Sequence, residues 1–300
     1  MCVSQELKLK VLTFNIWNLF VADHVPARMT AISEALEAAA LDPEGWDAVL
    51  LQELWTRKAR AAFGTAGYAH SAEAEHFWRR PICWLGALFG MQIDTGLKIL
   101  SKHPVLEVRR RTYSRRGSLW RAFKDGEVFA RKAALAAKLD HPTWGAIWVV
   151  DTHLIAAYSD RAYVTERKTQ IMELHDFVRE LMKDAPVILG GDLNVGPKVN
   201  EATPSNSYLP ELWDDLIPRA FGDFSRADWL DHTPTCSHLT CTWNDGTDEE
   251  CHLDHIFVGP GLGIEEASVV LDEAVELAPG LTGHLSDHYG FEVTVARDQG

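Results

Sequence analysis

Short apolar runs that end in polar residues recur along the chain, and each has the length of one buried strand. The predicted strands cover residues 10–17, 46–53, 97–101, 129–135, 146–153, 186–189, 254–258, 267–271 and 289–295. Two segments instead carry apolar residues at helical spacing, Ala27–Leu41 and Arg161–Lys183. Because strands and helices are intermixed along the whole chain, the pattern predicts an α/β protein.

Ionisable or amide side chains stand at the ends of these apolar runs. They are Asn15, Glu53, His153, Asp192, Asn194 and Asp254, and a Ser-Asp-His triplet at 286–288 precedes the last strand. Each has a structural explanation when taken alone, such as a bulge, a helix cap, a satisfied core histidine or a turn. Buried strand ends seldom carry so many ionisable groups, however, so the joint pattern predicts one functional site.

The stretch "GGDLNVGP" at Gly190–Pro197 follows one of these runs directly. Asp192 and Asn194 would point to the same side if the backbone stayed extended, because side chains alternate along a strand. Such a pair suits a hard metal ion or a phosphate group. It also suits an ordinary Asp/Asn turn, so this stretch alone leaves both interpretations open.

The 300-residue chain has a net charge of -14, which argues against binding nucleic acid by neutralising its phosphates. An acidic enzyme can still bind phosphate where divalent metals supply positive charge. No apolar run reaches the roughly 18 residues of a membrane-spanning helix, and the first residues lack a charged-then-apolar leader. We therefore expect no transmembrane segment, no signal peptide, and a cytoplasmic protein that can contact a membrane peripherally.

The chain contains five cysteines, Cys2, Cys83, Cys236, Cys241 and Cys251. An odd number fits a reducing compartment better than a disulfide framework. Cys236, Cys241 and Cys251 lie among three histidines within residues 232–252, which suggests a zinc site, although the spacing matches no standard zinc signature. The alternative is a set of buried thiols.

Hydrolysis of a phosphate ester is the chemistry that these residues fit. Mg²⁺ prefers few carboxylates together with water and substrate oxygens, and Glu53 and Asn15 could supply such ligands. A histidine held by a carboxylate is a suitable base for activating water, and His288 with Asp254 could form that pair.

The remaining strand-end residues have a place in the same reaction. Asp192 and Asn194 could position the nucleophile and the phosphoryl oxygens, and His153 could donate a hydrogen bond to the pentacoordinate phosphate. No serine or cysteine stands in a nucleophile-elbow motif, so a covalent acyl mechanism finds no support.

Six motifs, in chain order, resemble the endonuclease/exonuclease/phosphatase superfamily typified by pancreatic deoxyribonuclease. They are "LTFNIWNL", "LLQELW", "DTHL", "GGDLN", "LDHIFV" and "LSDHYG", and they cover nearly the whole chain. The resemblance implies a four-layer α/β sandwich, with two packed mixed β-sheets flanked by helices, formed by residues 1–300 as a single catalytic domain. It also implies a divalent-metal phosphodiesterase site between the edges of the sheets.

Other stretches are more specifically similar to the Mg²⁺-dependent neutral sphingomyelinases. They are "DTGLKILSKHPV" at Asp94–Val105, "FARKAALAAKL" around Lys132, and "THLIAAY" followed by "ERKTQIMELHDFV". The resemblance implies cleavage of sphingomyelin to ceramide and phosphocholine, a phospholipase C-type reaction. It implies Mg²⁺ as the cofactor, with Mn²⁺ or Co²⁺ as substitutes.

Carried onto this chain, the resemblance gives each motif residue a role. The implied catalytic residues are His288, His153, Asp254, Asp192, Asn194 and Asp287. Glu53 would be the main metal ligand with Asn15 beside it, and Lys132 and Tyr158 would contact the substrate. Two features depart from the family: its eukaryotic membrane-bound members continue into membrane-spanning helices, and His255 stands where many relatives have tyrosine.

The stretch "HFWRRPICWLGALFGM" at His76–Met91 mixes Trp78 and Trp84 with two arginines. Aromatic side chains beside basic ones suit insertion at a lipid headgroup layer, with a phospholipid as partner, and a core-packed loop is the alternative. The arginines at 109–111, 115 and 116 could steer the protein to anionic membranes or form a solvated face.

Other functions share parts of this pattern. A nuclease of the same superfamily would have the same metal site, but the charge of -14 disfavours it. An inositol-phosphate sphingolipid or a lysophospholipid remains open as the substrate. An inositol-polyphosphate 5-phosphatase is less favoured, because "CHLDHIFVGP" lacks the arginine-bearing phosphate motif. A catalytically inactive scaffold would have an eroded site, and here every expected group is present.

Overall fold

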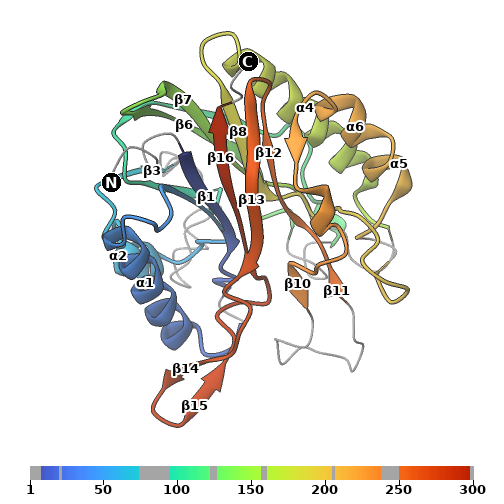
Figure 1. Ribbon diagram of the computed structural model, residues 1–300. Coiled ribbons are helices and arrows are strands. Elements are labelled where there is room, and N and C mark those ends of the chain that lie inside the picture. The colour runs from blue at the N-terminus through green and yellow to red at the C-terminus, as the bar shows by residue number, and fades with distance from the viewer. Residues whose placement is uncertain are drawn as a thin grey trace.

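The computed structural model describes residues 8–19, 22–73, 95–121, 127–156, 161–204, 207–237 and 250–297, and two six-stranded sheets form its centre (Figure 1). The strands of the first sheet are β1 (Lys8–Asn15), β2 (Ala48–Gln52), β3 (His70–Glu73), β4 (Lys98–Ser101), β13 (Leu262–Val270) and β16 (Gly290–Arg297). The strands of the second are β5 (Val105–Thr112), β6 (Ala133–His141), β7 (Gly145–His153), β8 (Val187–Asp192), β9 (Ser225–Arg226) and β12 (Asp254–Val258).

The strand order is β13-β16-β1-β2-β4-β3 in the first sheet and β5-β6-β7-β8-β12-β9 in the second. β1 runs parallel to β2 and β7 runs parallel to β8, whereas the other neighbours are antiparallel, so both sheets are mixed. Two hairpins lie outside the sheets, β10 (Cys236–Ser237) with β11 (Glu250–Cys251) and β14 (Val275–Ala278) with β15 (Leu281–Gly283).

Helices cover the outer face of each sheet. The α-helices are α1 (Val25–Leu41), α2 (Arg57–Phe63), α4 (Val164–Leu181), α5 (Pro210–Trp213) and α6 (Leu216–Phe221), and the 3₁₀ helices are η2 (Leu119–Arg121) and η3 (Asp228–Leu230). Figure 1 shows α1 and α2 beside the first sheet and α4, α5 and α6 beside the second. The predicted four-layer α/β sandwich is therefore confirmed.

Three apolar cores hold these layers together. Successive residues of a central strand face two different cores, because side chains alternate along a strand. On β1, Leu12 packs toward the helices and Val11 packs between the sheets. On β8, Leu189 faces the helices and Ile188 faces the other sheet. Because both faces of the central strands are buried, the sequence shows these strands as continuous apolar runs.

Two β-α-β units place the strand ends that carry polar residues. Helix α1 connects the parallel strands β1 and β2, and α4 connects β7 and β8. In register, Asn15 lies opposite Gln52 in one sheet. In the other sheet, Asp192 lies between His153 and Asp254. The polar ends of both sheets therefore meet at one end of the sandwich.

Some boundaries differ from those predicted. The second long helix spans Val164–Leu181 rather than Arg161–Lys183, and the strand predicted at 129–135 begins at Ala133. Strand β5 was not predicted, because it is an edge strand with exposed Leu106 and Val108 and lacks a buried apolar run. Among the described residues, no helix is long and apolar enough to cross a membrane. The cytoplasmic location stays a prediction.

Candidate active site

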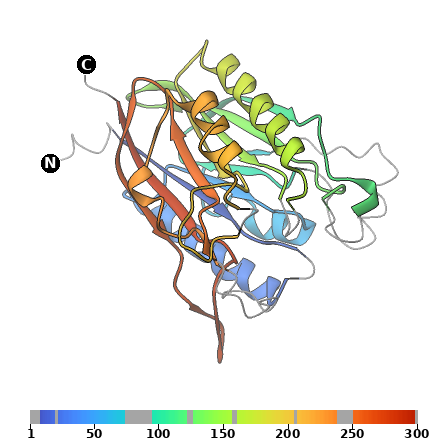
Figure 2. The same ribbon diagram turned by 90° about the vertical axis from the view of Figure 1, so that its right-hand side faces the viewer.

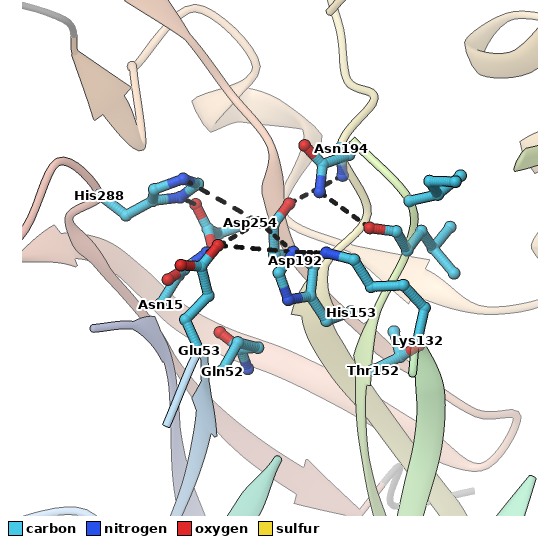
Figure 3. Close-up of polar contacts among 12 residues, drawn as sticks. Asn15, Gln52, Glu53, Lys132, Thr152, His153, Asp192, Asn194, Asp254 and His288 are labelled. Atoms are coloured by element: carbon cyan, nitrogen blue, oxygen red, sulfur yellow. Dashed lines mark hydrogen bonds and ion pairs between the residues drawn. The ribbon is translucent and has the colours of Figure 1, made fainter. Parts of the chain in front are cut away.

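Side chains from both sheets converge at this end of the sandwich, as Figure 3 shows. The first sheet supplies Asn15 and Glu53, and the second supplies Lys132, His153 and Asp192. Asn194, Asp254, Asp287 and His288 complete the set from β12 and the adjoining loops. Nine of the twelve predicted site residues therefore lie together. Trp78, Trp84 and Tyr158 lie outside the described residues.

Glu53 follows β2 directly and turns its side chain into the site. Its backbone has φ of +61°, a left-handed conformation that is costly for a residue other than glycine. The next residue is held by a hydrogen bond from the Leu54 N–H to the Gly96 carbonyl at 2.9 Å. Gly96 itself is needed beside Trp55, because a Cβ there would lie 2.9 Å from the indole. This explains the glycine in "DTGLKIL".

Asn15 joins two carboxylates. Its Nδ2 donates to Glu53 Oε1 at 3.3 Å and to Asp192 Oδ2 at 3.0 Å. Its Oδ1 accepts the Trp17 backbone N–H at 3.1 Å, which fixes the orientation of the amide. Asn15 therefore presents donors to the acidic groups here, and its role as an oxygen ligand of a metal stays a prediction.

Glu53 is a buried carboxyl group with acidic neighbours. Burial raises the pKa of Glu53 to about 7; Asp287 and Asp192 add to this effect, while Lys132 and His288 oppose it. The side chain is 17% exposed, but its Oε2 is buried without a hydrogen-bond partner among the described residues. An unpartnered carboxylate oxygen among acidic neighbours is the kind of donor that a hard cation takes.

His153 and Lys132 form a close pair on β7 and the loop before β6. Lys132 Nζ lies 2.7 Å from His153 Nε2, and the ammonium can only donate in this contact. Nε2 is then the acceptor, and the ring proton is on Nδ1. Burial, together with the charges of Lys132 and His288, lowers the pKa of His153 well below its usual value. Lys132, rather than the imidazole, is therefore the hydrogen-bond donor in this pair.

Asp192 is held at both carboxylate oxygens. The Asn194 N–H donates to Oδ1 at 2.8 Å, and Asn15 donates to Oδ2, which also lies 3.3 Å from His153 Nε2. Burial raises the pKa of Asp192, and Asp254 adds to the effect. The carboxylate therefore has little freedom to move.

The expectation that Asp192 and Asn194 share one face of an extended strand is wrong. Strand β8 ends at Asp192, and Asn194 is left-handed with φ of +52°. The chain forms an Asp/Asn turn in which the Asn194 side chain donates to the Leu154 carbonyl at 3.0 Å. The turn places Asp192 among the converging side chains, so the turn is compatible with a role in the site, and binding of a metal or a phosphate stays a prediction.

Asp254 and His288 form the predicted pair. His288 Nδ1 lies 2.8 Å from Asp254 Oδ2, and His288 Nε2 lies 4.0 Å from Asp192 Oδ2. Burial lowers the pKa of His288, but Asp254, Asp192 and Asp287 outweigh burial and raise it well above its usual value. The pairing fixes the ring with Nε2 on the side of Asp192.

Sequence reasoning missed Thr235 and Arg28, which hold this arrangement. Thr235 Oγ1 donates to Asp254 Oδ2 at 2.8 Å. Arg28, buried on α1, donates to four main-chain carbonyls, those of Ile16, Trp17, Asp23 and Leu285, and so joins the loop after β1 to the loop before His288. No local pattern marks either residue, because their roles depend on partners far away in the sequence.

The expectation of reduced cysteines in this region is wrong. Cys236 and Cys251 lie opposite each other on β10 and β11 with Cα atoms 5.3 Å apart, and they form a disulfide. Disulfide sulfurs cannot be the thiolate ligands of the suggested zinc site, and Cys241 lies outside the described residues. Within the described ranges, no three His, Cys, Asp or Glu side chains surround a point that could hold a metal.

Other sequence features lie outside the set of nine converging residues. His255 is buried, with Nε2 3.0 Å from the Val195 carbonyl and its ring stacked between Trp213 and His252. Arg109 and Arg111 pair with Glu180 on α4, at 3.8 and 3.5 Å. A separate cavity of about 550 Å³ lies beside α6, β9 and β13, and none of the nine site residues lines it.

The sequence profile described as "Endonuclease/Exonuclease/phosphatase family" matches residues 12–288. The chain belongs to this family. The matched range holds all nine of the converging residues, from Asn15 to His288, and the sandwich is the fold of solved relatives. One of them, sphingomyelinase C from Streptomyces griseocarneus, has a TM-score of 0.63 at 20% identity, covering 96% of this chain and 99% of that one.

Two curated relatives of this family member act on sphingolipids by their names. Inositol phosphosphingolipids phospholipase C of Schizosaccharomyces pombe is 25% identical over 326 residues, covering 99% of this chain and 70% of that protein. Sphingomyelin phosphodiesterase 2 of Mus musculus is 30% identical over 204 residues, covering 66% of this chain and 44% of that protein. The chain thus spans less than half the length of the mouse relative.

Proposed function

We propose that this family member is a Mg²⁺-dependent phosphodiesterase that hydrolyses sphingomyelin to ceramide and phosphocholine. The observation that carries the proposal is the convergence of Glu53, Asp192 and the Asp254–His288 pair at one end of the two sheets. The names of the two curated relatives support a sphingolipid as the substrate.

The residues present fit a divalent cation. Glu53 Oε2 is a buried oxygen without a hydrogen-bond partner among the described residues, and Asp287 and Asp192 add negative charge beside it. Mg²⁺ binds through one or two carboxylates and completes its shell with water and substrate oxygens, which matches so sparse a set. When bound, the cation would polarise the phosphoryl oxygens and offset the carboxylate charge that raises the pKa of His288.

The side chains of the site then have different roles in the attack of water on phosphorus. His288 takes a proton from the water through Nε2, while Asp254 holds Nδ1 and stabilises the imidazolium that forms. Asp192 keeps its place through Asn15 and Asn194, and it orients the water on the His288 side.

Charge that develops on the phosphate is met by Lys132. Its ammonium is buried beside His153, and burial strengthens its interaction with a phosphoryl or leaving oxygen. The bond from phosphorus to the ceramide oxygen breaks, and the ceramide oxygen takes up a proton. The products are ceramide and the phosphorylated head group.

A second head group has its own support. The relative aligned over 99% of this chain is the inositol phosphosphingolipid enzyme, whereas the sphingomyelin enzyme aligns over 66%. Inositol phosphoceramide is therefore the alternative substrate. Both substrates place the same phosphodiester between ceramide and the head group, so the same catalytic residues would serve either one.

The test measures head-group release from sphingomyelin and from inositol phosphoceramide in mixed micelles, with Mg²⁺ and with EDTA. We expect release in Mg²⁺ alone, with a loss of about 10²–10⁴-fold in His288→Ala. His175→Ala, on α4 where the ring packs against Phe221 of α6 and contacts none of the nine site residues, is the matched control and should keep full activity. Glu53→Gln removes one charge at equal size, and it should lower activity and weaken the Mg²⁺ dependence.

Phosphatidylcholine and plasmid DNA are the competing substrates in the same assay. Nicking of DNA with both sphingolipids left intact would overturn the substrate and retain the hydrolytic site. Release from a sphingolipid that is equal in Mg²⁺ and EDTA would overturn the metal dependence. If none of these phosphodiesters were cleaved, the proposal as a whole would fall.

A further inference from the structure

Trp120 is the most exposed large apolar side chain in the described part of the chain, at 98%. It lies on η2, which projects from the body of the molecule as the dark green turn at the right of Figure 2. Burying an indole stabilises a protein by about 1.5–3 kcal/mol, so folding of the chain by itself gives no reason for this position.

The backbone around Trp120 is held in place. The Ser118 N–H donates to Tyr163 Oη at 3.1 Å, and the Arg115 carbonyl accepts a hydrogen bond from Gln170 Nε2 at 3.0 Å. The Ser114 N–H donates to Glu173 Oε2 at 2.9 Å. Tyr163 immediately precedes α4, and Gln170 and Glu173 lie on it. Because α4 anchors this segment, residues 114–121, its backbone presents Trp120 to solvent at a defined place.

The segment leaves the second sheet at the end of the sandwich where the site residues converge. It follows β5, whose last residue, Thr112, lies opposite Ala133 on β6. Ala133 in turn lies opposite His153 on β7, and His153 lies opposite Asp192 on β8. The active-site end and Trp120 are therefore on the same side of the molecule.

Tyr113 connects the segment directly to the site. Its Oη lies 2.6 Å from Thr152 Oγ1, and its N–H donates to the Lys132 carbonyl at 3.2 Å. Lys132 is the donor beside His153, so Trp120 is seven residues away from an anchor within the catalytic set. A partner surface that binds Trp120 would therefore face the site.

Basic side chains accompany the indole. Arg115 and Arg116 are exposed on a chain whose net charge is -14, and the Arg121 guanidinium lies over the Tyr163 ring at 5.5 Å. An exposed tryptophan on the same short segment as exposed arginines suits the boundary between lipid headgroups and acyl chains. Arginines near an anionic leaflet add attraction that decreases with salt.

We propose that Trp120, with Arg115 and Arg116, is a contact surface for an anionic phospholipid bilayer. Insertion of the indole among the headgroups would set the active-site end of the sandwich against the lipid. The proposal deepens the proposed function, because it says how the site reaches a phospholipid. Membrane binding by this surface is nevertheless measurable without any turnover.

The experiment measures cosedimentation with vesicles in EDTA, for vesicles of phosphatidylcholine alone and of phosphatidylcholine with phosphatidylserine. Trp120→Ala should lower the partition coefficient at least about tenfold. The matched control is Trp229→Ala, on η3 after β9 at the opposite edge of the same sheet, which should leave the coefficient unchanged. Trp229 is 57% exposed and follows Asp228, and the nearby Arg226 is paired with Asp231.

A separate double variant tests the two arginines. Arg115→Ser with Arg116→Ser should lower binding roughly 5- to 30-fold on the vesicles with phosphatidylserine, and much less on phosphatidylcholine alone. Added salt should weaken wild-type binding and have less effect on this double variant. Turnover of bis(p-nitrophenyl) phosphate, a soluble diester, should be equal in the wild type and in Trp120→Ala.

Several results would overturn the proposal. Equal vesicle binding by Trp120→Ala and the wild type would remove Trp120 from the membrane surface, as would a wild type that binds neither kind of vesicle. If Trp120→Ala instead turned a dimer into a monomer and kept vesicle binding, the surface would join two copies of the chain. If binding depended on Trp120 but no phospholipid were cleaved, the membrane surface would stand and the proposed function would fall.

Discussion

Thr235 fixes the position of the Asp254 carboxylate, which pairs with the candidate base His288. Its hydroxyl donates to Asp254 Oδ2 at 2.8 Å and accepts the N–H groups of Leu253 and Asp254 at 2.9 and 3.1 Å. The same Oδ2 accepts His288 Nδ1–H. One buried hydroxyl therefore satisfies two backbone donors and orients the Asp254–His288 pair.

Replacing Thr235 by valine keeps the shape of the side chain and removes this network. Two buried N–H groups lose their acceptor, so we expect the free energy of unfolding to fall by about 2–4 kcal/mol. We expect kcat to fall about tenfold, a part of the contribution of a general base, with KM little changed. Steady-state kinetics on the cleaved phosphodiester and urea unfolding measure both effects.

Thr235→Ser is the control for this prediction. It keeps the hydroxyl and loses only a methyl group, so it should restore most of kcat. A serine variant as slow as the valine variant would show that packing of the methyl group, and not the hydrogen bond, matters at this position.

The convergence of individual residues was predictable where each stands at a strand end. Glu53, His153 and Asp192 each close an apolar run, and parallel strands with helical connections bring such ends together. Thr235 and Arg28 were not predictable, because a threonine in a loop and an arginine on a helix look the same whether or not their partners lie far along the chain. The orientation of Asn15, set by the Trp17 N–H, was hidden for the same reason.

At the scale of elements, the hairpin of β10 and β11 supports the segment that carries the candidate base. The Thr235 N–H donates to the Cys251 carbonyl at 2.9 Å within the hairpin. On the other side, the Ser237 N–H donates to the Asp287 carbonyl at 3.1 Å, and Cys236 forms a β-bridge with His288. The disulfide thus closes a hairpin that lies directly against Asp287 and His288.

Removing the disulfide should loosen this hairpin. The double change of Cys236 and Cys251 to alanine opens a link across 15 positions, and we expect the free energy of unfolding to fall by about 3 kcal/mol. We also expect lower activity, since the strand beside His288 loses its restraint. Urea unfolding and head-group release measure the two effects.

Reductant provides the matched comparison. It should lower the stability of the wild type to that of the double variant and leave the double variant unchanged. Non-reducing peptide mapping should recover Cys236 joined to Cys251. A wild type that is equally stable with and without reductant would contradict the stabilising role of the pair.

The larger elements were predictable because their burial is two-sided and regular. Strands β1, β2, β7 and β8 are apolar on both faces, and α4 has a clear stripe. Strands β3, β14 and β15 have only three or four residues, of which at most one is buried, so no long apolar run marks them. The disulfide was missed because an odd cysteine count says nothing about which two cysteines face each other across a hairpin.

At the scale of the whole molecule, a buried polar contact crosses between the two sheets. Gln52 Nε2, on β2, donates to Asp151 Oδ1 on β7 at 2.7 Å and to Thr13 Oγ1 at 3.0 Å. Asp151 is fully buried, and burial raises its pKa well above the usual value, against the opposing hydrogen bond from Gln52. The contact lies one residue before Glu53, and so it links sheet packing to the floor of the site.

The raised pKa of Asp151 gives a signed prediction for stability. The unfolded chain releases this proton near pH 3.9, whereas the folded chain still holds it there, so the group makes the folded state less stable as pH rises from that value toward the folded pKa. Asp151→Asn removes the ionisation at nearly equal shape. We expect the variant to unfold at the same urea concentration as the wild type near pH 4, and at a higher one near pH 8.

Asp184 offers a control with the opposite sign. Hydrogen bonds from Lys138 and Trp148 lower its pKa, so its carboxylate contributes stability above the unfolded pKa and loses that contribution as pH falls through the folded pKa. Asp184→Asn should therefore unfold at a lower urea concentration than the wild type at pH 7, and the difference should shrink toward acid pH. If the two variants changed stability in the same direction at pH 8, desolvation between the sheets would not be what raises the pKa of Asp151, and the packing of the two sheets would have to tolerate a charged carboxylate at its centre.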